Sequence, residues 1–241
     1  MTAPALAKPR RTLSAAAPAR APAVRSVPRI LLVDDHPLMR RGIRTLIEQD
    51  AHYEVCAEAD NPAQALEFLR QYSPSLCIVD ITLQSTNGIE LIKSLRAEQP
   101  DLLVLVVSMH DEEIYAERAL RAGASGYVMK HEAGDRLLAA MKRALEGEIY
   151  ISDRLRERML QRFVQGGEGT AAPTDVLSDR EMEVFQLIGV GYGTRAIATQ
   201  LNLSVKTIDS YREHLKVKLN LKSSADLLRY AIQWTKSQPS S

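Results

Sequence analysis

The stretch LLVLVV at residues 102–107 is a continuous apolar run with the length of one strand. A strand that is apolar at every position has to be covered on both faces, which is typical of a parallel sheet between two layers of helices. Four other short runs share this character, and each is followed by a segment with the helical spacing of apolar residues. The five expected strands are residues 30–33, 54–57, 76–79, 103–107 and 126–128. This order predicts a doubly wound α/β domain with a five-stranded parallel sheet over residues 29–148.

Polar side chains follow four of these strands. Asp34 and Asp35 end the first, Asp80 the third and Ser108 the fourth, and Lys130 follows the fifth. Ligands of a doubly wound sheet bind beyond the carboxyl ends of its strands, so these side chains are expected to meet. Three converging carboxylates repel one another unless a cation is bound, and an all-oxygen site suits Mg²⁺. Each carboxylate alone would be interpreted as a solvated turn or a helix cap, but their joint placement predicts a metal site.

The C-terminal segment has a helical pattern. Ser178 with Glu181 is a capping-box signature, and it opens a unit that extends over residues 176–236. Within this unit, residues 195–204 and 205–220 are two helices with a short turn between them, which is the spacing of a helix-turn-helix. We therefore expect a second, smaller, all-α domain.

The remaining segments connect or precede these two domains. Residues 149–175 combine an amphipathic stretch with several glycines, so we interpret them as a linker that contains a helix. Residues 1–28 are rich in Ala, Pro and Arg and contain few large apolar residues, which predicts a disordered basic tail, with a transit peptide as the alternative.

Charge is segregated along the chain. The net charge is +5 over residues 1–28, −7 over 29–148 and +3 over 149–241. An acidic middle segment followed by a basic one suits a cation or phosphoryl site next to a domain that binds a polyanion.

Cysteine usage and hydropathy indicate the compartment. Cys56 and Cys77 lie in strand-like runs without metal or redox spacing, so we expect buried, reduced thiols. No apolar run reaches the roughly 18 residues that a membrane span needs, and the N-terminus has no apolar signal-peptide core. A cytoplasmic protein without a membrane partner is expected.

Four motifs of the α/β segment carry a resemblance to a known family. They are VDDHPLMRRG at 33–42, VDITLQSTNG at 79–88, VVSMH at 106–110 and GYVMK at 126–130. Together they resemble the flavodoxin-like receiver domain of NarL/FixJ-type response regulators over the whole segment.

The resemblance implies a role for each strand-end residue. Asp80 would be the nucleophile that accepts a phosphoryl group from a phosphohistidine of a sensor histidine kinase. Asp35, Asp80 and the backbone carbonyl of Thr82 would bind Mg²⁺, and Asp34 would act on the metal mainly through water. Lys130 would pair with a phosphoryl oxygen.

The resemblance also implies a conformational switch. The hydroxyl of Ser108 would move toward the phosphoryl group, and the ring of Tyr127 would rotate inward in response. The alternative for Tyr127 is a half-buried strand tyrosine. Two residues depart from the family pattern: Gln84 replaces a proline and makes its loop less rigid, and His131 follows the lysine.

A second resemblance covers residues 177–219. The sequence LSDREMEVFQLIGVGYGTRAIATQLNLSVKTIDSYREHLKVKL resembles the LuxR-type helix-turn-helix over its whole length. It implies that the second helix of the pair enters the major groove of promoter DNA. The candidates for base or phosphate contact are Lys206, Thr207, Ser210, Tyr211, Arg212 and Lys216. Asp209 and Tyr211 stand where many relatives have lysine and histidine, so a specific base contact is not carried over. Relatives dimerise through the final helix, here residues 224–234, although core packing explains that helix equally well.

These features predict a phosphorylation-controlled transcription factor. It would not be an enzyme, beyond catalysing its own phosphoryl transfer and dephosphorylation. The expected partners are a sensor histidine kinase, promoter DNA and a second copy of the chain on DNA, and RNA polymerase is a further candidate.

Two other functions fit the sequence less well. A flavodoxin-like or haloacid-dehalogenase-like phosphatase would use a strand-end aspartate with Mg²⁺, but Asp80-Ile81-Thr82 lacks the second acidic residue of that class. A phosphorylation-independent DNA-binding or scaffolding protein would normally lack the acid pair, the nucleophile or the lysine, and this sequence has all of them.

Overall fold

The computed structural model of the chain describes residues 27–83, 86–164 and 173–237. Most of the expected tail (1–28), the departure at Gln84 and the linker glycines at 166, 167 and 169 lie outside the described residues.

Five strands form one parallel sheet in the order β2-β1-β3-β6-β7. They are β1 (Arg29–Val33), β2 (Glu54–Ala59), β3 (Leu76–Val79), β6 (Leu103–Ser108) and β7 (Gly126–Met129). The doubly wound parallel sheet expected from the sequence is thereby confirmed. A short antiparallel ribbon of β4 (Thr82–Leu83) and β5 (Thr86–Asn87), which the sequence analysis did not anticipate, follows β3.

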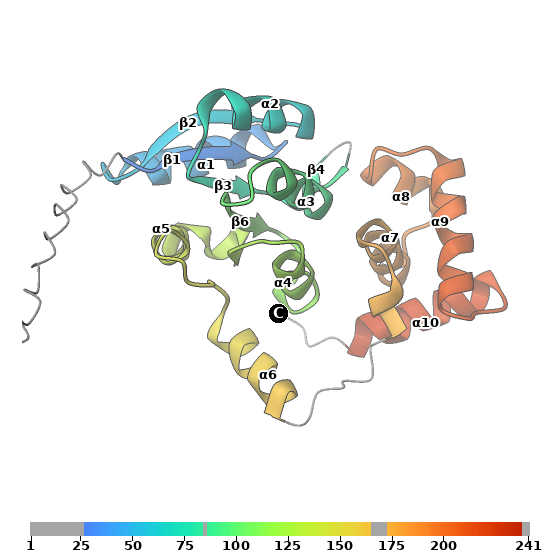
Figure 1. Ribbon diagram of the computed structural model, residues 1–241. Coiled ribbons are helices and arrows are strands. Elements are labelled where there is room, and N and C mark those ends of the chain that lie inside the picture. Colours follow the sequence, from blue (N-terminus) through green and yellow to red (C-terminus); the bar gives the residue numbers. More distant parts are fainter. Residues whose placement is uncertain (1–26, 84–85, 165–172, 238–241) are drawn as a thin grey trace, which may run out of the picture.

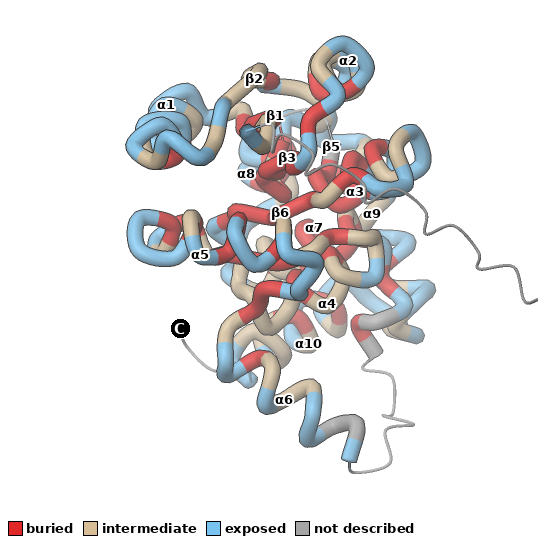
Figure 2. The backbone as a smooth tube through the Cα atoms, turned by 60° about the vertical axis from the view of Figure 1, so that its left-hand side comes forward, coloured by how far each residue is buried: buried red, intermediate tan, exposed pale blue. Residues whose placement is uncertain are grey.

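Helices cover both faces of the sheet (Figure 1). They are α1 (Pro37–Glu48), α2 (Pro62–Tyr72), α3 (Gly88–Glu98), α4 (Glu112–Arg121) and α5 (Ala133–Leu145), and the 3-10 turn η1 (Lys130–Glu132) precedes α5. Alternate strand residues point to opposite faces. Ile30 and Leu32 pack with α1 and α5, whereas Leu31 and Val33 pack with α2, α3 and α4. The inner strands are therefore buried on both faces, which explains their continuous apolar runs, and β3 and β6 are mostly red in Figure 2, whereas the edge strand β2 is not.

Side chains cap the starts of two helices of this domain. The Asn61 side chain accepts a hydrogen bond from Gln64 N, and the Asp111 side chain accepts one from Glu113 N. Gly88 begins α3 directly against the strand-end loop, where a Cβ would lie 2.1 Å from the Asp80 carbonyl oxygen. Only glycine allows the helix to start this close to the end of β3.

The C-terminal domain is all-α, as expected. It consists of the 3-10 turn η2 (Pro173–Val176), α7 (Asp179–Val190), α8 (Thr194–Gln200), α9 (Val205–Lys218) and α10 (Ser224–Ser237), and α6 (Asp153–Val164) precedes it. The capping box of Ser178 and Glu181 opens α7. Phe185 of α7 packs against Tyr230 and Trp234 of α10, with ring centroids 5.8 and 5.5 Å apart.

Helix α7 lies between the receiver-like domain and α9, and α9 lies on the outer side (Figure 1). Helix α6 packs beside α4, where Arg154 and Arg158 both pair with Glu113.

The two cysteines are free. Cys77 of the central strand β3 is buried as expected, but Cys56 is only partly buried. The expectation for Cys56 was wrong because β2 is an edge strand of the sheet, covered less completely than its interior.

Candidate functional site

The carboxyl ends of the strands bring distant residues together. Asp34 follows β1 and Asp80 follows β3, and these strands are neighbours, with Asp80 N donating to the Val33 carbonyl at 2.9 Å. Lys130 follows β7 at the far edge of the sheet, and its side chain reaches back to both carboxylates. The convergence expected from the sequence is present for these three residues.

Lys130 links the two buried carboxylates. Its Nζ lies 2.7 Å from Asp80 Oδ2 and 2.8 Å from Asp34 Oδ2. The exposed fractions of the three side chains are 3% for Lys130, 2% for Asp80 and 5% for Asp34. One ammonium group therefore faces two carboxylates out of contact with bulk water, and the cluster carries an excess of negative charge.

Asp35 completes the acidic cluster, together with a residue that the sequence analysis missed. His36 Nδ1 lies 2.7 Å from Asp35 Oδ1, 3.3 Å from Asp34 Oδ1 and 4.0 Å from Asp80 Oδ2. The His36 ring is 61% exposed, so it forms the outer rim of the site. Its place directly after the two aspartates in VDDH is the signal that could have identified it.

Burial sets the electrostatics of the cluster. It raises the pKa of Asp80 to about 6, and Asp34 adds to the shift, while Lys130 and the Thr82 backbone N–H oppose it. The pKa of Lys130 is also raised: burial lowers it, but the attraction of Asp80 and Asp34 outweighs burial. At neutral pH the site therefore contains a carboxylate held at an electrostatic cost beside a firmly protonated lysine.

The donor set fits a hard divalent cation. One ligand atom from each of Asp34, Asp35, His36 and Asp80 lies within 4.8 Å of the others. Asp80 Oδ1 is buried and has no hydrogen-bond partner among the described residues. A buried carboxylate oxygen without a partner is costly, and a cation or a bonded phosphorus atom would relieve that cost.

The expected switch residues meet at His110, in the loop between β6 and α4. Ser108 is fully buried, and its Oγ accepts a hydrogen bond from His110 N at 3.2 Å. The hydroxyl of Tyr127, whose side chain is buried and points toward this loop, donates to the His110 carbonyl oxygen at 2.8 Å. Thr82 Oγ1 is 2.9 Å from His110 Nε2. The alternative of a half-buried Tyr127 is contradicted, because its exposed fraction is 1%.

Helix α9 presents the expected DNA-binding residues. Ser204 caps the helix by accepting from Thr207 N at 3.0 Å, and Ile208 and Leu215 are buried against the domain. Lys206 and Ser210 are exposed, and the other four candidates are half-buried: Thr207, Tyr211, Arg212 and Lys216.

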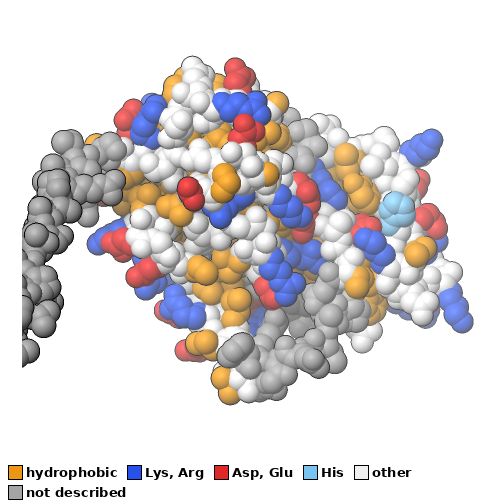
Figure 3. Space-filling view, in the orientation of Figure 1, with side chains coloured by type: hydrophobic (Ala, Val, Ile, Leu, Met, Phe, Trp, Pro, Cys, Tyr) orange, Lys and Arg blue, Asp and Glu red, His pale blue; other side chains and the backbone are white. Residues whose placement is uncertain are grey.

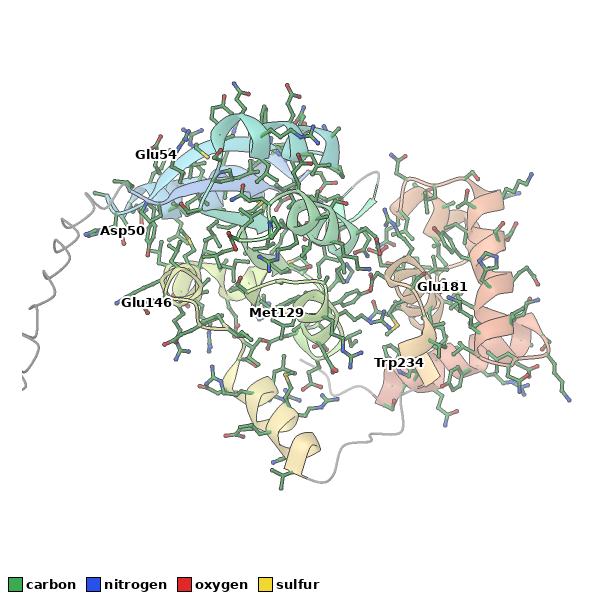
Figure 4. All side chains as sticks on the ribbon, in the orientation of Figure 1. Asp50, Glu54, Met129, Glu146, Glu181 and Trp234 are labelled. Atoms are coloured by element: carbon green, nitrogen blue, oxygen red, sulfur yellow. The ribbon has the colours of Figure 1, made fainter. Side chains whose placement is uncertain are left out.

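The inner side of α9 is tied to α7. Glu181, which is labelled on α7 in Figure 4, accepts from Lys218 Nζ at 2.6 Å.

Figure 3 shows Lys and Arg side chains at the right-hand edge over α9, with acidic side chains among them. Lys216, for example, pairs with Glu213 at 2.9 Å. Basic groups on this face are therefore partly compensated within the helix itself.

Contacts between α7 and the first domain were not anticipated. The hydroxyl of Tyr115 on α4 donates to Gln186 Oε1 at 2.7 Å. The Arg118 guanidinium donates to the Leu177 carbonyl at 2.9 Å and to Asp179 Oδ1 at 3.2 Å. Polar residues on the α7 face opposite its apolar side were the available signal, but they do not reveal their partner.

Two family models match the chain. The model of the response regulator receiver domain matches residues 30–142, and the model of bacterial regulatory proteins of the luxR family matches residues 175–231.

Relatives extend over nearly the whole chain. A nitrate/nitrite response regulator protein homolog of Haemophilus influenzae is 36% identical over 195 residues, which are 81% of this chain and 91% of that protein. The oxygen regulatory protein NreC of Staphylococcus aureus is 31% identical over 210 residues, 85% of this chain and 97% of that protein.

A solved structure is similar over both domains. RcsB of Salmonella enterica serovar Typhimurium, bound to promoter rprA in the presence of the phosphomimetic BeF3⁻, is 27% identical, with a TM-score of 0.56. The match covers 86% of this chain and 99% of that one. Within the described part of the chain, no helix is both long enough and apolar enough to span a membrane.

Proposed function

Because the chain belongs to the response regulators that join a receiver domain to a LuxR-type DNA-binding domain, we propose that Asp80 is its phosphoacceptor and that phosphorylation controls promoter binding. The donor would be the phosphohistidine of a sensor histidine kinase. The observation that carries the proposal is the buried convergence of Asp34, Asp80 and Lys130, with Asp35 beside them, because an isolated cluster of this kind is unfavourable without a phosphoryl group or a cation to complete it.

The chemistry follows from the contacts of Asp80. An Asp80 carboxylate oxygen would form a bond to phosphorus while the bond from phosphorus to the histidine nitrogen breaks, and the electron pair returns to the imidazole. Lys130, already 2.7 Å from the carboxylate, would hold its proton and balance the added charge of the acyl phosphate. Ser108 would donate its hydroxyl hydrogen to a phosphoryl oxygen, and its movement toward that oxygen would draw Oγ away from His110 N.

The residues fit Mg²⁺ as the cofactor. Asp35, Asp80 and the Thr82 carbonyl would hold the ion, and Asp34 would act through water. The ion would supply positive charge next to the transferring phosphoryl group. Support comes from the clustered carboxylates and from the unpartnered oxygen Asp80 Oδ1.

The second half of the proposal concerns DNA. The six residues named on α9 would contact bases and phosphates, with the basic side chains supplying the salt-dependent affinity. The solved RcsB structure bound to a promoter supports this function for a similar chain. Two copies would pair on DNA through α10, where Leu228 is 40% exposed. We place the protein in the cytoplasm, without enzymatic activity beyond turnover of its own phosphoryl group.

Phosphoryl labelling tests the first half. The full chain is incubated with acetyl phosphate and Mg²⁺, and intact-protein mass spectrometry counts the phosphoryl groups that have been added. We expect one phosphoryl group on the wild type and none on Asp80→Asn. The matched control is Asp101→Asn, because Asp101 is an exposed aspartate outside the cluster. Equal labelling of the wild type and Asp80→Asn would overturn the proposal.

Footprinting tests the second half. The DNA upstream of the gene is probed with phosphorylated and unphosphorylated protein at equal concentrations. Stronger protection by the phosphorylated form supports control by Asp80, and identical footprints would support a constitutive DNA-binding protein.

A further inference from the structure

His110 lies where the phosphorylation site, the switch residues and the DNA-binding domain come closest together. Its backbone is held from two sides, because His110 N donates to Ser108 Oγ at 3.2 Å and its carbonyl oxygen accepts from the Tyr127 hydroxyl at 2.8 Å. A displacement of either Ser108 or Tyr127 therefore acts directly on the position of His110.

The His110 ring makes three contacts, each with a different element. Its Nε2 lies 2.9 Å from Thr82 Oγ1, two residues after Asp80, and the ring packs on Tyr115 of α4 at a centroid separation of 4.5 Å. The same Nε2 lies 3.9 Å from Glu183 Oε1 of α7. The ring is 26% exposed, so it fills the junction between the two domains without being sealed off from water.

Polar residues lie on the face of α7 that meets the receiver, beside an apolar cluster that includes both Met182 of α7 and Tyr115 of α4. Asp179, Glu183 and Gln186 are spaced so that they lie on one side of the helix. Asp179 contacts Arg118, Gln186 accepts from Tyr115, and Glu183 is 2% exposed, with its Oε2 accepting from Arg180 at 2.7 Å. Within the described residues, Glu183 Oε1 is buried and has no partner with full hydrogen-bond geometry. Burial raises the pKa of Glu183, and the Arg180 guanidinium and the Asn87 side chain only partly oppose that shift.

This composition favours reversible docking. Exposure of the apolar part of this contact is costly, whereas the carboxylates and the amide regain hydration when they leave the receiver. The incompletely paired oxygen of Glu183 makes the docked state less stable than full pairing would, so a small change at its neighbour can shift the equilibrium.

We infer that His110 is a positioning residue that couples the Asp80 site to the docking of helix α7 on the receiver. The inference rests on the proposed function. When Ser108 turns toward a phosphoryl group it releases His110 N, and the loop carries the His110 ring away from Thr82, Tyr115 and Glu183. The α7 face then loses its central contact, and the DNA-binding domain is freed.

The coupling controls how freely the DNA-binding domain moves relative to the receiver, and it does not change the exposure of α9. No hydrogen bond or ion pair joins α9 to the receiver within 27–83, 86–164 and 173–237, and α9 lies on the far side of α7 (Figure 1). Release of α7 therefore leaves the DNA-binding face unchanged, and it allows two copies to reorient and pair on DNA half-sites.

Hydrogen exchange of residues 177–190 tests the coupling. Full-length protein is measured with and without beryllium fluoride and Mg²⁺, and the ratio of exchange rates in the two states reports how strongly the site controls docking. We expect a ratio of about fivefold or more in the wild type, the lower end of usual coupling between sites, and below about twofold in His110→Ala.

Two variants distinguish a coupling role of His110 from a purely structural one. Tyr115→Phe removes the hydrogen bond to Gln186 but keeps the ring beneath His110, so exchange should rise in both states with the ratio retained. Arg121→Ala, on an exposed part of the same helix, should match the wild type. If His110→Ala instead behaves like Tyr115→Phe, His110 is a structural support only and the inference is overturned.

Labelling of the same samples with acetyl phosphate distinguishes the two hypotheses. Wild-type protein that takes up one phosphoryl group but shows equal exchange of α7 in both states overturns the coupling and leaves the proposed function standing. Wild-type protein that takes up none overturns the proposed function itself.

Discussion

The Asp80 site and the outer face of α9 are both rich in charge, but they differ in burial. Asp34, Asp80 and Lys130 are almost fully buried, whereas Lys206 and Ser210 are exposed on α9. A buried charge is costly unless a partner compensates it, so the geometry of the first site restricts its chemistry closely. An exposed charge costs little, so the position of the α9 side chains does not restrict their binding chemistry in the same way. Burial, more than charge itself, restricts which partners a charged site can have.

The largest expected effect is on stability when Lys130 is removed. Lys130→Met keeps the length of the side chain but leaves two buried carboxylates without their shared cation, so we expect a loss of about 3–5 kcal/mol in the free energy of unfolding. Urea unfolding in metal-free buffer measures it. Lys142→Met is the control, because Lys142 is an exposed residue of α5 away from the cluster, and an equal loss in both variants would contradict the account.

A smaller effect of opposite sign is expected for Asp80→Asn. Because folding raises the pKa of Asp80 from 3.8 to about 6, the folded state binds the proton more tightly, and the wild type loses stability as pH rises through this range. The asparagine variant avoids the loss and should be more stable by on the order of 3 kcal/mol above pH 6.

The pH dependence checks the cause. The advantage of Asp80→Asn should shrink as pH falls from 6 and disappear below 3.8, where the Asp80 carboxyl is protonated in both the folded and unfolded states. Thermal unfolding without metal across this range measures it. An advantage that stays constant with pH would assign the effect to packing instead of charge.

The smallest effect on stability is expected at α9. Lys206→Ala should change the free energy of unfolding by less than about 0.5 kcal/mol, because the side chain is exposed. It should nevertheless weaken DNA binding and reduce the slope of log affinity against log salt by about 1. Lys236→Ala, an exposed lysine on α10, is the matched control, and an equal change of slope in both variants would remove Lys206 from the interface.

Local signals predicted the fold and the cluster. The strand runs specify a buried parallel sheet, and in such a sheet Asp34 and Asp80 must meet because their strands are neighbours. Cap residues such as Asn61 and Ser178 act on amides within a few residues, so sequence spacing alone identifies them.

Contacts between distant segments could not be predicted in the same way. Tyr115 and Gln186 are 71 residues apart, and helical spacing indicates which face each occupies but not which surface it meets. The β4–β5 ribbon was missed because two-residue strands have no periodicity. The contacts of His110 could not be predicted either, because they come from four elements that are distant in the sequence.

The most direct test of the central claim is to locate the phosphoryl group chemically. An acyl phosphate is reduced by borohydride to an alcohol, so an aspartyl phosphate leaves homoserine at its own position. Full-length protein is labelled with acetyl phosphate and Mg²⁺, reduced and sequenced by mass spectrometry. Homoserine at position 80 is the predicted result, and homoserine at position 34 or 35, or at no aspartate, would contradict the account.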